Sequence, residues 1–206
     1  MQTKSRLILA TRNAHKTAEI RAMIGDAFEV LDVTSFPECP EIEETGCTFL
    51  ENATLKAVGI SRVLEGWVLS DDSGLEVDAL GGAPGVWSSS FGGVEGNHAL
   101  NNATLLEKMA GRQDRSARFR CTMVLAQGGL VRAHFSGTVD GSIIDQPRGV
   151  KGFGYDPLFI PVGYYQTFAE LGEEVKNTLS HRARALAQVI EFLTGRNPPH
   201  PPQMEI

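Results

Sequence analysis

The stretch LILATRNAHKTAEIRAMI, residues 7–24, sets the fold class of this chain of 206 residues. It opens with a four-residue apolar run that is typical of a buried strand, and a polar segment follows at residues 11–16. Apolar side chains then recur at roughly helical spacing, at Ala18, Ile20, Met23 and Ile24. The stretch therefore predicts a strand, a loop and a helix in succession, which favours an α/β fold.

The rest of the chain continues this alternation. Further strands are expected at 28–33, 67–70, 75–79, 118–126, 131–139 and 158–160. Further helices are expected at 49–64, 96–110 and 178–194. The two strands that flank residues 127–129 form a hairpin, so we expect a mixed sheet. We predict one α/β domain over residues 1–194 and a poorly ordered tail over 195–206, which holds four prolines.

The composition excludes several classes of protein. Apolar residues make up 42% and charged residues 21%, which is typical of a globular domain and not of a disordered one. The net charge of −6 argues against a duplex-DNA binder. The three cysteines form no CxxC motif, and no apolar run is long enough for a secretory signal or a membrane span. We therefore expect a soluble, cytoplasmic protein with reduced thiols and no membrane or nucleic-acid partner.

The loop at residues 11–16 lies between a strand and a helix N-terminus, where backbone amides and the helix dipole favour anions. Thr11, Asn13 and Lys16 add hydrogen-bond donors, so the loop is a candidate phosphate site. The pair Lys16-Thr17 imitates the end of a P-loop, but the glycines that such a loop needs are missing. A capped turn with a solvated lysine is the alternative.

Acidic residues point to a second candidate site. No Lys or Arg occurs between Arg21 and Lys56, and Glu44 lies in this acidic stretch. Asp71 and Asp72 then follow the apolar strand at 67–70, at an expected strand end where α/β folds bind ligands. Two carboxylates from different segments are suitable ligands for Mg²⁺. A solvated acidic loop and a simple turn at residues 71–74 are the alternatives.

Three further segments carry polar or aromatic side chains in suggestive positions. Thr48, Asn52 and Lys56 are four residues apart on one helix face, which is also what a surface helix shows. The segment GFGYDP, residues 152–157, presents an aromatic ring between two glycines, and such a ring stacks on a base or packs within a loop. His181 and Arg182 lie in the first turn of the last helix, where cations oppose the dipole unless an anion or a carbonyl-rich ligand is near.

The order of these segments is more specific than any one of them. ATRNAHK (10–16), EETGCTFLENATLKA (43–57), DDSGLEVDALGGAPGVWSS (71–89), GFGYDPLF (152–159) and KNTLSHRARAL (176–186) together resemble the Ham1/RdgB-like inosine triphosphate pyrophosphatase family. The similarity extends from about residue 6 to 194. Family members hydrolyse non-canonical purine nucleoside triphosphates.

The resemblance implies an elongated mixed sheet flanked by helices, with two lobes and a cleft between them. It also implies a homodimer that requires Mg²⁺ and converts ITP, dITP and XTP to the monophosphate and pyrophosphate. By motif, Glu44 and Asp72 would hold Mg²⁺, with Asp72 and Lys56 as catalytic residues. The expected substrate-binding residues are Thr11, Arg12, Asn13, Ala14, His15, Lys16, Ser73, Phe153, Gly154, Tyr155, Asp156, Lys176, His181 and Arg182.

Within this resemblance, Phe153 would stack on the purine, and His181 and Arg182 would donate to its six-oxo group. Adenine has an amino group there, so it would leave a donor unpaired. The sequence departs from the family pattern at Arg12 and His15, where small residues are common, and at Trp87, where Tyr is frequent.

Three other functions stay open at this point. One is a Maf-like pyrophosphatase acting on modified or pyrimidine nucleotides, which the GFGYDP and SHR segments disfavour. Another is a non-catalytic nucleotide-binding protein, which Glu44 and Asp72 disfavour. The last is a nucleic-acid binder that would use Arg112, Arg115, Arg118 and Arg120, which the acidic net charge disfavours.

Overall fold

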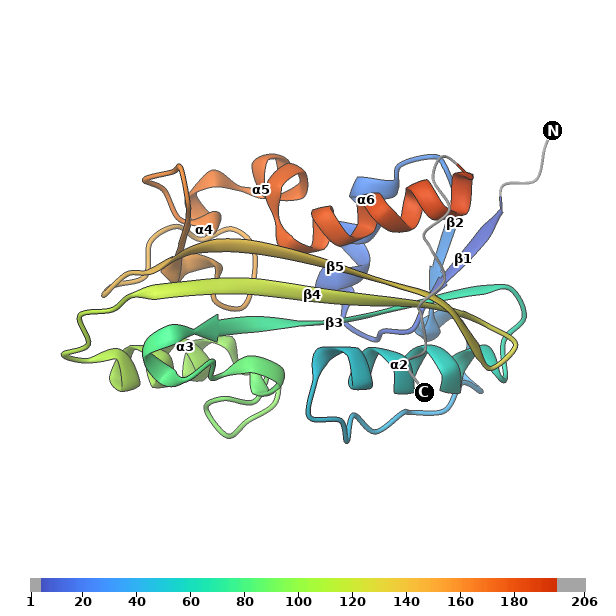
Figure 1. Cartoon of the computed structure of the whole chain (residues 1–206), viewed down its shortest axis with the longest axis horizontal. Helices are drawn as coiled ribbons and strands as arrows, with labels where there is room; N and C mark the ends of the chain where they lie inside the picture. Colours follow the sequence, from blue (N-terminus) through green and yellow to red (C-terminus); the bar gives the residue numbers. More distant parts are fainter. Residues whose placement is uncertain (1–4, 196–206) are drawn as a thin grey trace, which may run out of the picture.

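The computed structural model describes residues 5–195, so the predicted tail lies almost wholly outside the described residues. One six-stranded sheet crosses the molecule in the order β2-β1-β3-β4-β5-β6 (Figure 1). Its strands are β1 (Arg6–Leu9), β2 (Glu29–Asp32), β3 (Trp67–Val77), β4 (Ser116–Gln127), β5 (Leu130–Ile143) and β6 (Phe159–Pro161). β1 pairs in parallel with β2 and β3, whereas all pairs from β3 to β6 are antiparallel. The predicted mixed α/β fold is confirmed.

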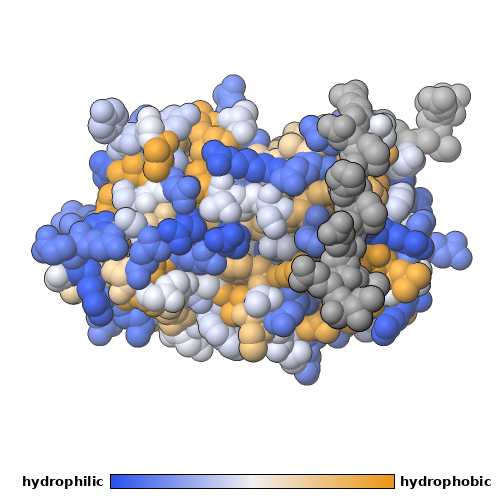
Figure 2. All heavy atoms as spheres, viewed as in Figure 1, coloured by the Kyte–Doolittle hydropathy of each residue, from blue (hydrophilic) through white to orange (hydrophobic). Residues whose placement is uncertain are grey.

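Helices cover both faces of this sheet. They are α1 (Ala14–Ile24), α2 (Phe49–Ser61), α3 (His98–Met109), α4 (Phe168–Leu171), α5 (Glu173–Leu179) and α6 (His181–Thr194). In Figure 1, α2 and α3 lie below the long strands, and α4, α5 and α6 lie above them. Within the described part of the chain, no helix is long and apolar enough to cross a membrane. Figure 2 shows hydrophilic and hydrophobic side chains interspersed over one face.

Local chemistry explains where the helices begin. The Asn13 side chain accepts hydrogen bonds from the amides of His15 and Lys16 and so caps α1. Thr48 and Glu51 form a capping box at the start of α2, so Thr48 is the N-cap and not part of a helical stripe. Ser180 caps α6. The last helix therefore starts three residues later than predicted, and the residues before it form α5.

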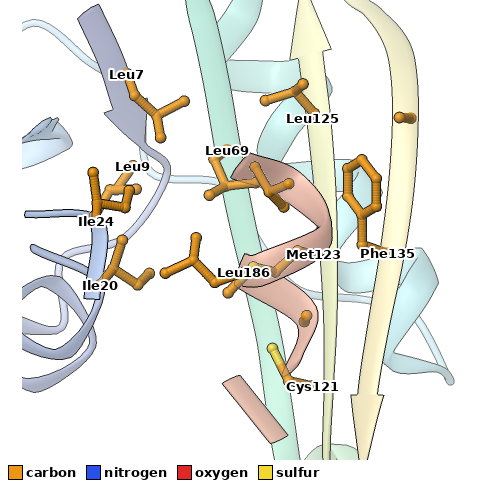
Figure 3. Close-up of a cluster of buried hydrophobic side chains, with 13 residues drawn as sticks. Leu7, Leu9, Ile20, Ile24, Leu69, Cys121, Met123, Leu125, Phe135 and Leu186 are labelled. Atoms are coloured by element: carbon orange, nitrogen blue, oxygen red, sulfur yellow. The ribbon is translucent and has the colours of Figure 1, made fainter. Parts of the chain in front are cut away.

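Two hydrophobic cores lie toward opposite ends of the long strands. One core packs α1 and α6 against the sheet and includes Leu9, Leu69 and Leu186 (Figure 3). The other surrounds Leu75, Phe159 and Phe168. The polar stretch of β3 from Ser70 to Gly74 lies between them. The elongated sheet therefore carries a polar segment between two apolar ends.

One sequence prediction about β3 is wrong in a way that matters for the site. Residues 67–70 and 75–79 were expected to be separate strands with a turn or strand end at residues 71–74. Instead β3 runs unbroken, and β4 pairs with it from Val68 to Val77. The two aspartates therefore lie in the middle of a strand, and their side chains point to opposite faces.

Candidate active site

A cavity of about 820 Å³ lies where β1 ends and β3 continues. β1 pairs with β3 only as far as Leu69, whose carbonyl also accepts from the amide of Ala10. Beyond that point, side chains meet the free edge of β3: Lys16 and Lys56 donate to the Asp71 carbonyl, and Ser88 accepts from the amide of Leu75. The cavity therefore lies beside the stretch of β3 that has no paired strand on its β1 side.

Asp71 and Asp72 are neighbours in sequence but have different surroundings. Asp71 is buried on the α6 side, where its carboxylate accepts from Arg182 Nε at 3.0 Å and from the Cys121 thiol at 3.0 Å. Lys16 Nζ lies 2.5 Å from Asp71 Oδ1. Burial alone would raise the pKa of Asp71, but Arg182 and Lys16 hold it well below the ordinary value. Asp71 is therefore a fixed anion.

Asp72 faces the cavity with fewer partners. Its Oδ2 is buried and has no hydrogen-bond partner among the described residues, and Lys56 Nζ is 3.7 Å from its Oδ1. Burial raises the pKa of Asp72 to about 6, with smaller contributions from Glu44 and Asp71, while the two lysines oppose the rise. Asp72 can therefore exchange a proton near neutral pH.

Lys56 connects this carboxylate to the acidic loop. Its Nζ lies 2.6 Å from Glu44 Oε2 as well as near Asp72. Within residues 5–195, no three His, Cys, Asp or Glu side chains gather as potential metal ligands. Two carboxylates, one with an unpartnered buried oxygen, nevertheless fit a divalent cation, because hard cations accept carboxylate oxygens and complete their shell with water and phosphate.

The opposite end of the cavity is formed by the loop around Phe153. Asp156 Oδ2 accepts from the Phe153 amide at 2.9 Å and from Lys176 Nζ at 2.6 Å. Gly152 has φ of 73°, and a Cβ there would collide with Asp156, so this tight turn requires glycine. The Tyr155 hydroxyl donates to the Ser88 carbonyl at 2.8 Å and ties the loop to the segment between β3 and α3.

Buried ion pairs join the two ends of the cavity. Lys176 Nζ lies 2.6 Å from Asp156 and 2.8 Å from Glu19, and Arg182 Nη1 donates to Glu19 at 2.5 Å. Arg182 in turn pairs with Asp71. The anion that Arg182 needs at the helix N-terminus is therefore supplied by the protein itself. Glu19 was missed because its partners lie more than 150 residues away in sequence.

His181 is a neutral aromatic side chain in this arrangement. Burial, together with Arg182 and Lys176, lowers the pKa of His181 well below the ordinary value. The imidazole stacks on Phe119 at 4.9 Å with an interplanar angle of 12°. Its Nδ1 is buried without a hydrogen-bond partner among the described residues, although His181 lines the cavity.

The structure brings most of the residues named from sequence into one cavity. The named residues in its lining are Thr11, Arg12, Asn13, Lys16, Glu44, Lys56, Asp72, Ser73, Phe153, Gly154, Tyr155, Asp156, Lys176, His181 and Arg182. Ala14 and His15, both exposed residues in the first turn of α1, are not in the lining. Arg12 also donates to the Cys39 carbonyl at 3.0 Å.

Some lining residues were not predicted from the sequence. Asn52 belongs to the polar stripe of α2, but it turns inward and accepts from the Gly46 amide at 2.7 Å. Ser88 and His98 also line the cavity; Ser88 falls within the quoted motif 71–89 but was given no role, and no motif included His98. By contrast, the possible basic stripe is neutralised, since Arg118 pairs with two aspartates and Arg120 with Glu76.

Comparison with known proteins places this geometry in a family. The model of the Ham1 family matches residues 7–192. A dITP/XTP pyrophosphatase from Exiguobacterium sp. is 46% identical over 92% of this chain and 100% of its own length, and one from Geobacter sulfurreducens is 46% identical over 92% and 96%. A HAM1 protein structure from Coxiella burnetii has a TM-score of 0.84 and 39% identity, covering 93% of this chain and 99% of that one. The Staphylococcus aureus Ham1 protein has a TM-score of 0.83 and 35% identity, covering 94% and 100%. The chain belongs to the Ham1 family.

Proposed function

We propose that this protein is a nucleoside triphosphate pyrophosphatase that hydrolyses dITP, XTP and ITP to the monophosphate and pyrophosphate. In this role it removes non-canonical purine nucleotides from the nucleotide pool. The observation that carries the proposal is Asp72, a cavity-facing carboxylate with a raised pKa beside two lysines, in a chain of the Ham1 family.

The triphosphate is assigned to the end of the cavity near loop 11–16. Thr11, Asn13 and Lys16 line it there, and Lys56 reaches the same region from α2. A nucleoside triphosphate carries about four negative charges, which these cations and the N-terminus of α1 would offset. When the phosphates bind, Lys16 and Lys56 would exchange part of their contact with the Asp71 carbonyl for phosphate oxygens.

Mg²⁺ is proposed as the cofactor, with Glu44 and Asp72 as its protein ligands. The unpartnered Asp72 oxygen and the nearby Glu44 carboxylate support this assignment. A bound Mg²⁺ would neutralise phosphate charge and lower the pKa of a water molecule. Lys56, which now contacts Glu44, would then be free to turn toward the phosphates.

In the reaction we propose, water adds to the α-phosphorus and the bond from that phosphorus to the bridging oxygen breaks. Asp72 accepts the proton that the water loses, and pyrophosphate leaves. Lys16 and Lys56 stabilise the charge that develops on the leaving group. The pKa of the neighbouring Asp71 is held well below its ordinary value, so Asp71 accepts a proton less readily, which supports Asp72 as the base.

The purine is assigned to the end near Phe153, where its six-oxo group would meet donors. Of the five N–H groups of Arg182, four make the described hydrogen bonds to Glu19, Asp71 and Ser73, which leaves one for a base carbonyl. An adenine amino group would leave that donor unpaired, at a cost of about 1–3 kcal/mol. This supports selectivity for six-oxo purines over ATP.

The test is a pyrophosphate-release assay with Mg²⁺ and dITP, XTP, ITP, GTP or ATP supplied in turn. We expect turnover of the first three and little with ATP. Comparable turnover of ATP would contradict the selectivity, and release of orthophosphate would contradict the cleaved bond. Binding of XTP without any turnover would favour a non-catalytic nucleotide-binding protein instead.

We also propose that the protein acts as a homodimer in the cytoplasm, as the family resemblance suggests. The cysteines Cys39, Cys47 and Cys121 are all unpaired, which suits a reducing compartment. Light scattering on the purified protein tests the assembly, with about twice the chain mass of 22.3 kDa expected. A mass of one chain would contradict the dimer.

A further inference from the structure

The imidazole of His15 lies against the ring of Phe153, although the two residues are far apart in sequence. His15 is the second residue of α1, and Phe153 belongs to the loop between β5 and β6. The ring centroids are 5.1 Å apart and the interplanar angle is 14°, so the rings are stacked. His98, the first residue of α3, lies 6.3 Å from His15 and 6.1 Å from Phe153. Three distant segments therefore meet at one ring.

The two main neighbours of Phe153 have different relations to the cavity. Phe153 and Lys176 both line it, and Lys176 Nζ lies 4.6 Å from the centre of the ring. His15 is exposed, and it is not among the described residues that line the cavity. The imidazole therefore packs on Phe153 without lining the cavity, whereas Lys176 contacts the same ring and lines the cavity.

The backbone around Phe153 does little to orient this ring. Glycines precede and follow it, with φ of 73° and 62°, and its amide donates to Asp156. Those contacts fix the main chain, whereas the direction of the ring depends on what packs against it. A ring with rotational freedom would lose conformational entropy when a base stacks on it, and a ring already held in place would lose less.

We propose that His15 is a positioning residue that holds Phe153 as the stacking platform for the purine. The inference rests on the proposed function, which assigns the base to this ring. In this role His15 acts through Phe153 and not on the reacting atoms. Because it lies beside Lys16 on the same helical turn, it also links the orientation of the base platform to the phosphate loop.

The backbone of His15 is held independently of its imidazole. Its amide donates to Asn13 Oδ1 at 3.0 Å, and the Lys16 amide donates to the same oxygen at 3.3 Å. Alanine keeps that amide and is the best helix former at an exposed position. The variant His15→Ala therefore removes the ring stack while leaving the cap and the helix in place.

The test compares steady-state kinetics of His15→Ala and His15→Phe with the unaltered protein, using XTP and Mg²⁺. We expect KM to rise about two- to tenfold in His15→Ala, which is the range of one aromatic pair, with kcat within twofold. Phenylalanine restores the stack and should return KM to the original value. His134→Ala, which removes an exposed imidazole on β5, is the matched control and should change neither constant.

A double-mutant cycle shows whether the effect passes through Phe153. In a Phe153→Ala background, His15→Ala should raise KM no further. An equal rise in both backgrounds, an unchanged KM, or a lower KM in His15→Ala would overturn the inference; the last result would mean that His15 occupies the place of the base. An unaltered protein that releases no pyrophosphate from any purine nucleotide would count against the proposed function, whereas an active protein whose KM is independent of residue 15 counts against this inference alone.

Discussion

The two faces of β3 shift the pKa of an aspartate side chain in opposite directions. On the α6 side, Asp71 is surrounded by Arg182, Lys16 and the Cys121 thiol, and its pKa falls well below the ordinary value. On the cavity side, Asp72 has one buried oxygen without a partner and a pKa of about 6. Both carboxylates are buried. The comparison teaches that the partners a carboxylate meets, and not its burial alone, decide between an ion that stabilises the fold and a group that exchanges protons.

The difference also gives the two neighbouring aspartates different roles. The charge of Asp71 is balanced by residues of the folded protein. Removing that charge would leave its buried partners unpaired, so the fold depends on it. One carboxylate oxygen of Asp72 lacks a partner until a cation or a proton binds there. The ionised side chain therefore lowers the stability of the fold. The predictions below test this division, beginning with the largest effect.

Asp72→Asn should reduce kcat by about a hundredfold to ten-thousandfold, the usual contribution of a general base. An amide has the shape of the carboxylate but cannot accept the proton of the attacking water. The measurement is pyrophosphate release from XTP at saturating Mg²⁺. Circular dichroism should show an unchanged fold. Near-normal turnover would mean that another residue is the base.

Asp71→Asn should lower the free energy of unfolding by about 3–5 kcal/mol, because it leaves Arg182 and Lys16 buried without their shared anion. Urea denaturation at pH 7 measures the change. Asp145→Asn is the matched control, since the Asp145 side chain is 89% exposed, and no measurable change is expected there. Equal effects at the two positions would remove the distinction between the faces of β3.

Asp72→Asn should also stabilise the protein at pH 7.5, by about 2–3 kcal/mol in the absence of divalent cations. The folded state binds a proton at Asp72 more tightly than the unfolded state, whose pKa is near 3.8. The carboxylate therefore weakens the fold progressively as pH rises from about 4 to above 6. The gain from asparagine should disappear at pH 4, and urea titrations at both pH values measure it. A gain that is independent of pH would contradict the raised pKa.

Cys121→Ala should have the smallest effect, a loss of about 0.5–1.5 kcal/mol of stability with kcat unchanged. The thiol donates one hydrogen bond to Asp71 on the face of β3 opposite to Asp72. Cys121→Ser offers a replacement donor and should recover part of the loss. A fall in kcat for either variant would show that the two faces of β3 are coupled.

Local patterns were enough to predict the outer parts of the site. The alternation of apolar and polar residues located β1, α1 and the loop between them, and the cap at Asn13 follows from residue type. Most of the residues that the motif resemblance named then proved to line the cavity. Each of these signals is contained in a short stretch of sequence, so the fold class and the polar ends of the cavity could be anticipated.

The continuous strand in the middle of the site and the role of Glu19 could not be predicted, because both depend on residues that are distant in sequence. Polar residues on both faces of β3 resemble a turn, and only Arg182 and the neighbouring strand β4 make this stretch a buried strand. Glu19 similarly resembles a solvated residue of α1 until Lys176 and Arg182 are placed beside it. The short helix α4 has only four residues, too few for a helical pattern to emerge.

The stretch of β3 that has no paired strand on its β1 side affects how the molecule behaves at high concentration. An unpaired strand edge is a template on which another chain can add a strand, and proteins often block such edges with lysine. Here Lys16 and Lys56 cap the Asp71 carbonyl, and Ser88 caps the Leu75 amide. The lysines that would bind a nucleotide therefore also cover an unpaired stretch of the sheet, which disfavours self-association there. A variant that neutralises both lysines would therefore sacrifice solubility together with catalysis.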